Sequence, residues 1–96
     1  MATGTLLLDL HLPYAGNLKE KRAVVRHLLD ACRHRYRVAA SEVGALDLTQ
    51  RSELAFAAVS AAVAHVEDVL DEVERFVLSH PEIELLRAHR VWSEDR

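Results

Sequence analysis

Hydrophobic and polar positions alternate at the start of the chain. The even-numbered leucines from Leu6 to Leu12 alternate with Leu7, Asp9 and His11. Successive side chains of a strand point to opposite faces, so a period of two indicates one buried face. We predict a strand over roughly residues 3–12.

A long amphipathic helix is predicted next. Pro13 and Gly16 break the alternation, and Asn17 is followed three positions later by Glu20, which is the spacing of a helix N-cap with a reciprocating carboxylate. Hydrophobic residues then recur at helical spacings and form one stripe, made of Leu18, Val25, Leu28, Leu29, Cys32 and Tyr36. The pattern predicts a helix from about Leu18 to Arg37.

The second half of the chain repeats this plan. The segment 38–43 is short and rich in small and β-branched residues, which favours a strand. Residues 44–50 are predicted to form a loop. Hydrophobic and other residues alternate over 51–60, which predicts a strand whose second face is nearly uncharged. Ser60 is expected to cap a second helix that ends near Ser79. A fourth strand is predicted over residues 83–92, before a charged tail at 93–96 that we expect to fray.

The order of the elements indicates the fold. Strand, helix, strand, strand, helix, strand is two split β-α-β units, whose right-handed crossovers put both helices on one face of the sheet. We predict an α+β fold, the ferredoxin-like βαββαβ sandwich, with a four-stranded antiparallel sheet. The 96 residues are 50% hydrophobic, which suits a single domain over residues 1–96.

Composition excludes several kinds of site. The single cysteine, Cys32, allows no intramolecular disulfide and lies on the hydrophobic stripe, so we expect a buried structural thiol. The three glycines are too far apart for a phosphate-binding loop or a nucleophile elbow. We expect no cofactor, no metal and no catalytic residue, and interpret the chain as non-enzymatic.

Without a long apolar run or a basic leader the protein is expected to be soluble and cytoplasmic. Its ten arginines and two lysines suggest a thermophile or a high-GC genome.

Charge is sorted between the two helices. Residues 18–37 carry a net charge of +5 and the rest of the chain −8. Five cations fall within about 80° of a helical wheel: they are Lys19, Arg22, Arg26, Arg33 and Arg37. This stripe could follow the phosphate backbone of RNA. Alternatively, it could pair with the acidic second helix across a shared groove, leaving a protein-interaction or structural module.

The uncovered face of the sheet is the second candidate surface. Leu7, Ala55, Ala57 and Val59 are expected to face solvent there. Contiguous exposed apolar surface usually marks a contact site, so a homodimer through this face, or through an edge strand, is predicted. The alternatives are that small alanines are tolerated in the open, or that a regulatory small ligand binds at the dimer interface.

Polar strings along the chain carry a family resemblance. They are His11-Leu12-Pro13, Asn17-Leu18-Lys19-Glu20-Lys21-Arg22, Ser41-Glu42-Val43 with Asp47-Leu48 and Gln50-Arg51, and Val59-Ser60. Together they resemble the YlxP-like family of small uncharacterised bacterial proteins, over about residues 5–92. The resemblance implies a ferredoxin-like fold and a bacterial cytoplasmic setting. Genes of this family often lie near those of translation and ribosome-maturation factors, so the resemblance also implies a role with RNA or the ribosome. It implies candidate contact residues Lys19, Lys21 and Arg22, and no catalytic residue.

Overall fold

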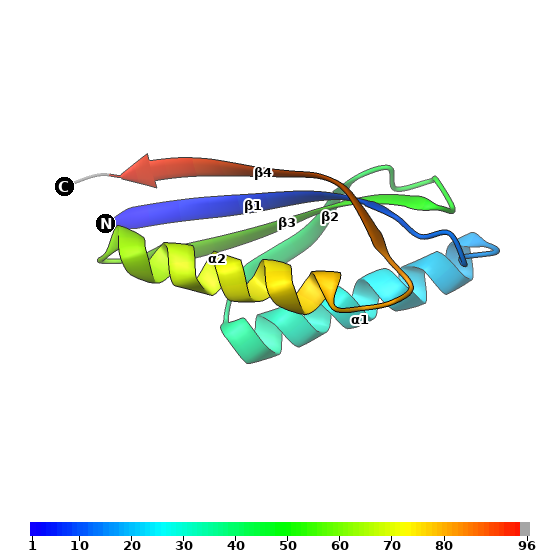
Figure 1. Cartoon of the computed structure of the whole chain (residues 1–96), viewed down its shortest axis with the longest axis horizontal. Coiled ribbons are helices and arrows are strands. Elements are labelled where there is room, and N and C mark those ends of the chain that lie inside the picture. The colour runs from blue at the N-terminus through cyan, green and yellow to red at the C-terminus, as the bar shows by residue number, and fades with distance from the viewer. Residues whose placement is uncertain (95–96) are drawn as a thin grey trace.

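Six elements make up the computed structural model, which describes residues 1–94 (Figure 1). In chain order they are β1 (Ala2–His11), α1 (Leu18–Tyr36), β2 (Ala39–Gly44), β3 (Arg51–Ser60), α2 (Val63–Leu78) and β4 (Glu84–Glu94). The sheet has the order β2-β3-β1-β4, and all its neighbouring strands are antiparallel. Both helices lie against the same face of the sheet (Figure 1). The predicted ferredoxin-like sandwich is confirmed.

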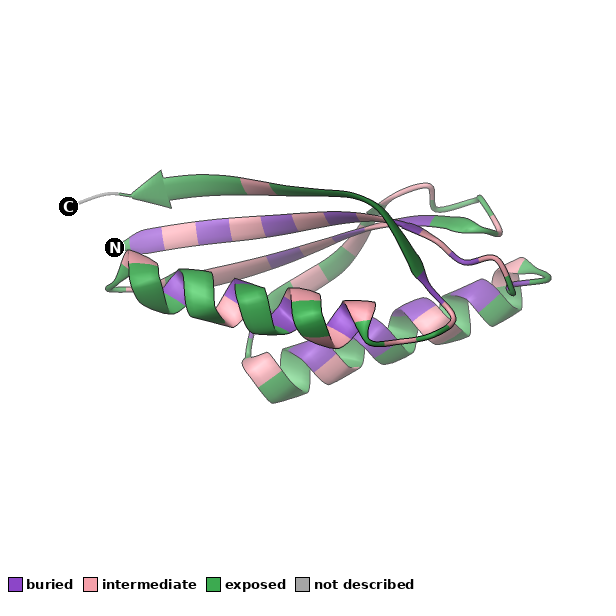
Figure 2. Cartoon of the chain, viewed as in Figure 1, coloured by how far each residue is buried: buried purple, intermediate pink, exposed green. Residues whose placement is uncertain are grey.

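The core lies between this sheet face and the two helices. Residues of β1 alternate between buried and half-buried, as the period of two predicted (Figure 2). Leu28 and Leu29 of α1 are 0% and 8% exposed, which confirms the hydrophobic stripe of the first helix. From α2, Val66, Leu70, Val73 and Val77 are fully buried in the same cluster. The faces that the strand and helix periodicities predicted to be buried therefore meet in one shared core.

Gly4 lies where α2 packs closely against the sheet. A Cβ atom at this position would lie 2.7 Å from Val66 Cγ1 and 2.9 Å from Trp92 Cζ3. Real Cβ contacts are not this short, so the missing side chain is what allows α2 and β4 to pack over β1 here.

The predicted N-cap of α1 is confirmed. The backbone N–H of Glu20 donates to Asn17 Oδ1 at 2.8 Å, and the Glu20 carboxylate in turn accepts from the backbone N–H of Gly16 at 2.8 Å. The helix ends at Tyr36, one residue before the predicted boundary, because Arg37 adopts a left-handed conformation with φ 57° and caps it.

Two predicted boundaries were wrong. The N-cap of α2 is Ala62 and has no side-chain cap, because Ser60 still belongs to β3 and only accepts a hydrogen bond from the Ala62 N–H at 3.3 Å. At the other end, β4 continues through Ser93 to Glu94, both paired with β1, so these residues are not a frayed tail. The rest of that predicted tail, residues 95–96, lies outside the described part of the chain.

Candidate nucleic-acid interface

The solvent face of α1 borders a shallow groove beside the edge strand β2. Its volume is about 390 Å³, and its lining includes three arginines of α1, two on adjacent turns and the third two turns later. The lining residues are Arg22, Arg26, Arg33, Val25, Leu29, Asp30 and Glu42. We call this surface the arginine groove. The arginine groove brings together three of the five cations that the helical wheel predicted.

The arginines of the groove differ in their partners. Arg33 forms an ion pair with Asp30 at 3.0 Å and donates to the backbone carbonyl of Ala40 in β2. Both partners of the ion pair are about half exposed, so its contribution to stability is small. Arg22 and Arg26 form no ion pair within residues 1–94, and neither does Lys19 one turn earlier. Their charges are therefore available to an anionic ligand.

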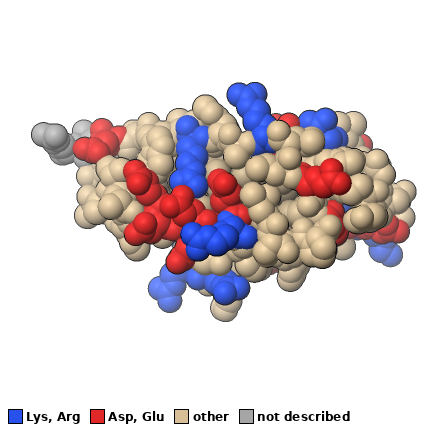
Figure 3. All heavy atoms as spheres, viewed as in Figure 1, with Lys and Arg blue, Asp and Glu red and all other residues tan. Residues whose placement is uncertain are grey.

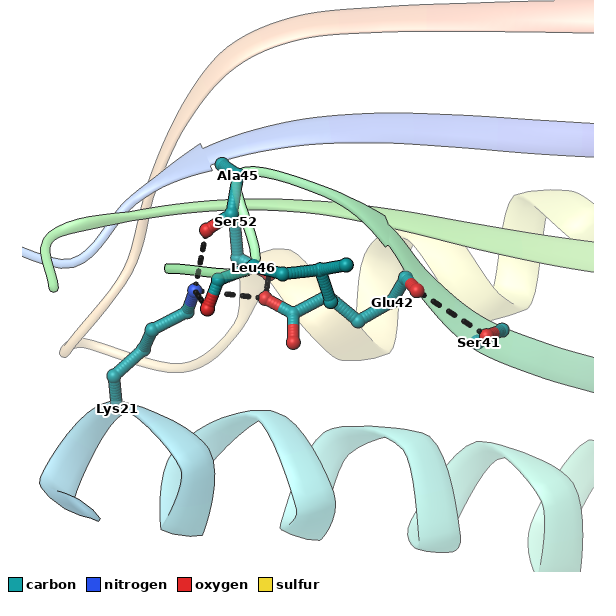
Figure 4. A network of polar contacts seen from close by, with 6 residues as sticks. All are labelled: Lys21, Ser41, Glu42, Ala45, Leu46 and Ser52. Atoms are coloured by element: carbon teal, nitrogen blue, oxygen red, sulfur yellow. Dashed lines mark hydrogen bonds and ion pairs between the residues drawn. The ribbon is translucent and has the colours of Figure 1, made fainter. Parts of the chain in front are cut away.

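Lys21 does not lie on this surface, which corrects its selection as a contact residue. Its side chain is 0% exposed, and its ammonium lies 2.9 Å from Glu42 Oε2 (Figure 4). It also donates to the carbonyls of Ala45 at 2.7 Å and Leu46 at 3.2 Å. These contacts use all three ammonium donors. Lys21 ties α1 to the loop after β2 and has no donor left for a phosphate.

Arg37 is also separated from the groove. Because the helix ends at Tyr36, helical spacing no longer places the Arg37 side chain on the stripe. It instead lines a hollow of about 350 Å³ near the end of β3, together with Tyr36 and Val59. Of the six candidate cations, the structure therefore leaves Lys19, Arg22, Arg26 and Arg33 on one continuous helix face.

The acidic helix α2 does not neutralise this face. Within residues 1–94, no ion pair joins α1 to α2. Two acids of α2 instead contact Arg90 of β4, whose Nη2 lies 2.8 Å from Asp71 Oδ1 and 3.4 Å from Glu74 Oε1. Acidic side chains gather over α2 (Figure 3). The predicted alternative of pairing across the shared groove therefore has no ion pair to support it within residues 1–94.

The open face of the sheet is apolar at one end and charged at the other. Leu7 and Ala55 are half-buried neighbours across β1 and β3, and Ala57 and Val59 continue along β3, with Val59 65% exposed. Beside Leu7 is a hollow of about 240 Å³, lined also by Asp9, Glu53, Arg87 and His89. The four predicted interface residues do lie on one face, next to a cluster of charges.

Charged side chains near this hollow contact partners on neighbouring strands. Asp9 forms an ion pair with Arg51 at 3.0 Å, and His11 contacts Glu84 at 3.3 Å. The residue of β4 opposite Asp9 is Arg87, whereas His89 lies opposite Leu7.

Cys32 is buried, as predicted. Its side chain is 0% exposed, and burial raises the pKa of the thiol from 9.0 to about 11. A neutral, enclosed thiol is a poor nucleophile. Across residues 1–94, no three His, Cys, Asp or Glu side chains are grouped closely enough to hold a metal ion. In the same part of the chain, neither helix combines the length and the hydrophobicity needed to cross a membrane.

Comparison with known proteins assigns the chain to a family. Residues 3–90 match the family described as "Protein of unknown function (DUF503)". The chain is also 40% identical over 78 residues to the "Uncharacterized protein YlxP" of Bacillus subtilis (strain 168), a match that covers 81% of this chain and 85% of that protein. Both findings agree with the resemblance carried by the polar strings. The chain belongs to the DUF503 family of proteins of unknown function.

Proposed function

We propose that this protein is a non-enzymatic binding module whose arginine groove contacts the phosphate backbone of RNA. The observation that carries the proposal is the pair Arg22 and Arg26, which have no ion-pair partner within residues 1–94 and stand beside Arg33 on one wall of the groove. A guanidinium group donates paired hydrogen bonds to phosphate oxygens, and its planar face can stack on a base.

The remaining charges of the molecule support a local contact. The net charge is −3, so no long-range attraction to RNA is expected from the whole protein. The two acids that line the groove already have partners, because Asp30 pairs with Arg33 and Glu42 with Lys21, so Arg22 and Arg26 keep their charges for a phosphate within the ~8 Å over which charges interact at physiological salt. The acidic surface of α2 repels a polyanion and restricts the contact to the α1 side. Val25 and Leu29 also line the groove but are only 5% and 8% exposed, so the contact rests on the arginines.

The test is a salt titration of binding to a fluorescein-labelled single-stranded RNA. Each phosphate contact contributes about 0.7 to the slope of log K against log salt. The Arg22→Ala, Arg26→Ala double variant should therefore bind more weakly and flatten the slope by about 1.4. Arg33 is left in place because it also donates to Asp30 and Ala40.

The matched control removes two other exposed arginines. Arg35 and Arg75 lie outside the arginine groove, so the Arg35→Ala, Arg75→Ala variant makes the same change in net charge. It should keep the wild-type slope and affinity to within a factor of about 2. If the groove variant binds like the wild type, or the control variant loses as much affinity, the RNA contact is not made by the groove.

A further inference from the structure

The edge strand β4 is exposed on both of its faces. It pairs only with β1, and within Glu84–Glu94 only Arg90 is partly buried (Figure 2). Four large hydrophobic side chains lie along it in the open: Leu85, Leu86, Val91 and Trp92 are 40%, 48%, 51% and 42% exposed. Such a strand presents an unpaired row of backbone N–H and C=O groups beside apolar surface.

The other edge of the sheet is protected. Strand β2 has six residues, its pairing with β3 is interrupted between Glu42 and Gly44, and Arg33 donates to its Ala40 carbonyl. By contrast, β4 has eleven residues and pairs with β1 without a shift from Arg87 to Glu94. Short length, a bulge and a covering charge are the usual devices against edge pairing. Strand β2 carries all three devices, whereas β4 is long, has its one register shift between Leu85 and Arg87, and uses one of its charges, Arg90, to contact α2.

We propose that β4 pairs antiparallel with β4 of a second copy of this chain, across a two-fold axis perpendicular to the sheet. The partner must itself offer a strand, because only a strand satisfies the row of unpaired backbone N–H and C=O groups along β4. A second copy fits because a register centred on His89, the midpoint of Glu84–Glu94, overlaps the whole strand. That register also sets Trp92 of each copy against Leu86 of the other.

The size of this contact suits a weak, reversible dimer. Eleven residues of strand extend roughly 36 Å, and a sheet with its side chains is roughly 10 Å thick. The area is then about 360 Å² per copy, about half of the ~800 Å² per partner of stable protein complexes, so the association should depend on concentration. Stacking two open sheet faces would instead enclose the charges of Asp9, Arg51, Glu53 and Arg87, whereas edge pairing leaves them in water. Charge therefore favours the edge over the face.

The first test compares two lysine substitutions by sedimentation velocity over a range of concentrations. Val91 lies on β4 and Val59 on the open face of β3, and both side chains are more than half exposed. The wild type should self-associate above its monomer mass of 10.8 kDa. Val91→Lys should weaken this association by tenfold or more, and Val59→Lys should leave it unchanged. A monomeric wild type at ~100 μM, or dissociation by Val59→Lys alone, overturns the proposal.

The second test fixes the register and does not depend on the fold of a charged variant. Residues facing each other across the axis have Cα atoms about 4.5–5.5 Å apart, within reach of a disulfide. The His89→Cys variant should therefore oxidise to a covalent dimer at low micromolar concentration. Ala57→Cys on the open face should not, and the native Cys32 is buried. A covalent dimer from Ala57→Cys but not from His89→Cys contradicts the edge pairing. Neither test measures RNA binding, so they stand apart from the proposed function.

Discussion

Replacing Lys21 with methionine tests whether the buried ammonium is structural. The substitution keeps the aliphatic stem and removes the charge, so it leaves Glu42, 13% exposed, without its partner at 2.9 Å. The carbonyls of Ala45 and Leu46 lose their donor as well. Removing one partner of a buried ion pair costs about 3–5 kcal/mol. A domain of this size has about 5–15 kcal/mol of total stability, so Lys21→Met should lower Tm by at least ~12 °C.

Urea denaturation followed by far-UV circular dichroism measures this loss. Lys19→Met is the matched control, because Lys19 is exposed and has no ion-pair partner within residues 1–94; it should change the free energy of unfolding by less than ~0.5 kcal/mol. Adding Glu42→Gln to Lys21→Met should recover part of the loss, because the uncompensated charge is then gone. A cost below ~1 kcal/mol for Lys21→Met would show that the lysine is solvated and that the reasoning is wrong.

Two further predictions concern the core. Leu28 is 0% exposed, so Leu28→Ala should cost about 2–5 kcal/mol in chemical denaturation, and a cost under ~1 kcal/mol would mean that the stripe of α1 is not buried. Because the pKa of Cys32 rises from 9.0 to about 11 on folding, the unfolded chain loses this proton first. Stability should therefore fall between pH 9 and 11 by about 1.4 kcal/mol per unit relative to Cys32→Ala, and parallel pH profiles of the two proteins would refute this.

Periodicity was sufficient to predict the fold. Alternation in β1 and the helical repeat in α1 each bury one face, so the hydrophobic pattern fixes which side of these two elements meets the core. The end of α1 was less predictable. Arg37 continues the helical wheel in sequence, yet its left-handed backbone ends the helix at Tyr36 and moves its side chain away. A wheel assumes a helix and cannot show where the helix stops.

Lys21 illustrates a signal that was present but was interpreted by residue type alone. It precedes Val25 by four positions and Leu28 by seven, so helical spacing already placed it on the buried stripe. Lysine is almost never fully buried unless it is paired, and the partner, Glu42, comes from a strand 21 positions later. The spacing could therefore indicate burial, whereas the network that makes burial acceptable required the tertiary structure.

The exposure of β4 also depends on tertiary structure, because it follows from where α2 lies. Gly4 leaves room for Val66 of α2 and for Trp92 to pack closely over β1, and Arg90 reaches back to Asp71 on that helix. The helix thus covers the centre of the sheet and leaves the outer strand overhanging (Figure 1). No pattern within residues 84–94 indicates this offset, since a strand covered by a helix could have the same sequence pattern.

The two proposed surfaces are compatible in space. Strands β2 and β4 form opposite edges of the sheet, and the arginine groove lies beside β2. Pairing through β4 would set the two acidic α2 helices toward the middle of the dimer and the two grooves toward its ends. Because a perpendicular two-fold axis keeps all helices on one side, both grooves would face the same way. A single RNA could then contact both grooves only by crossing the acidic centre of the dimer. Each groove should therefore bind a separate RNA segment. A stoichiometric titration should give one RNA site per chain. A stoichiometry of one RNA oligonucleotide per dimer would contradict this arrangement.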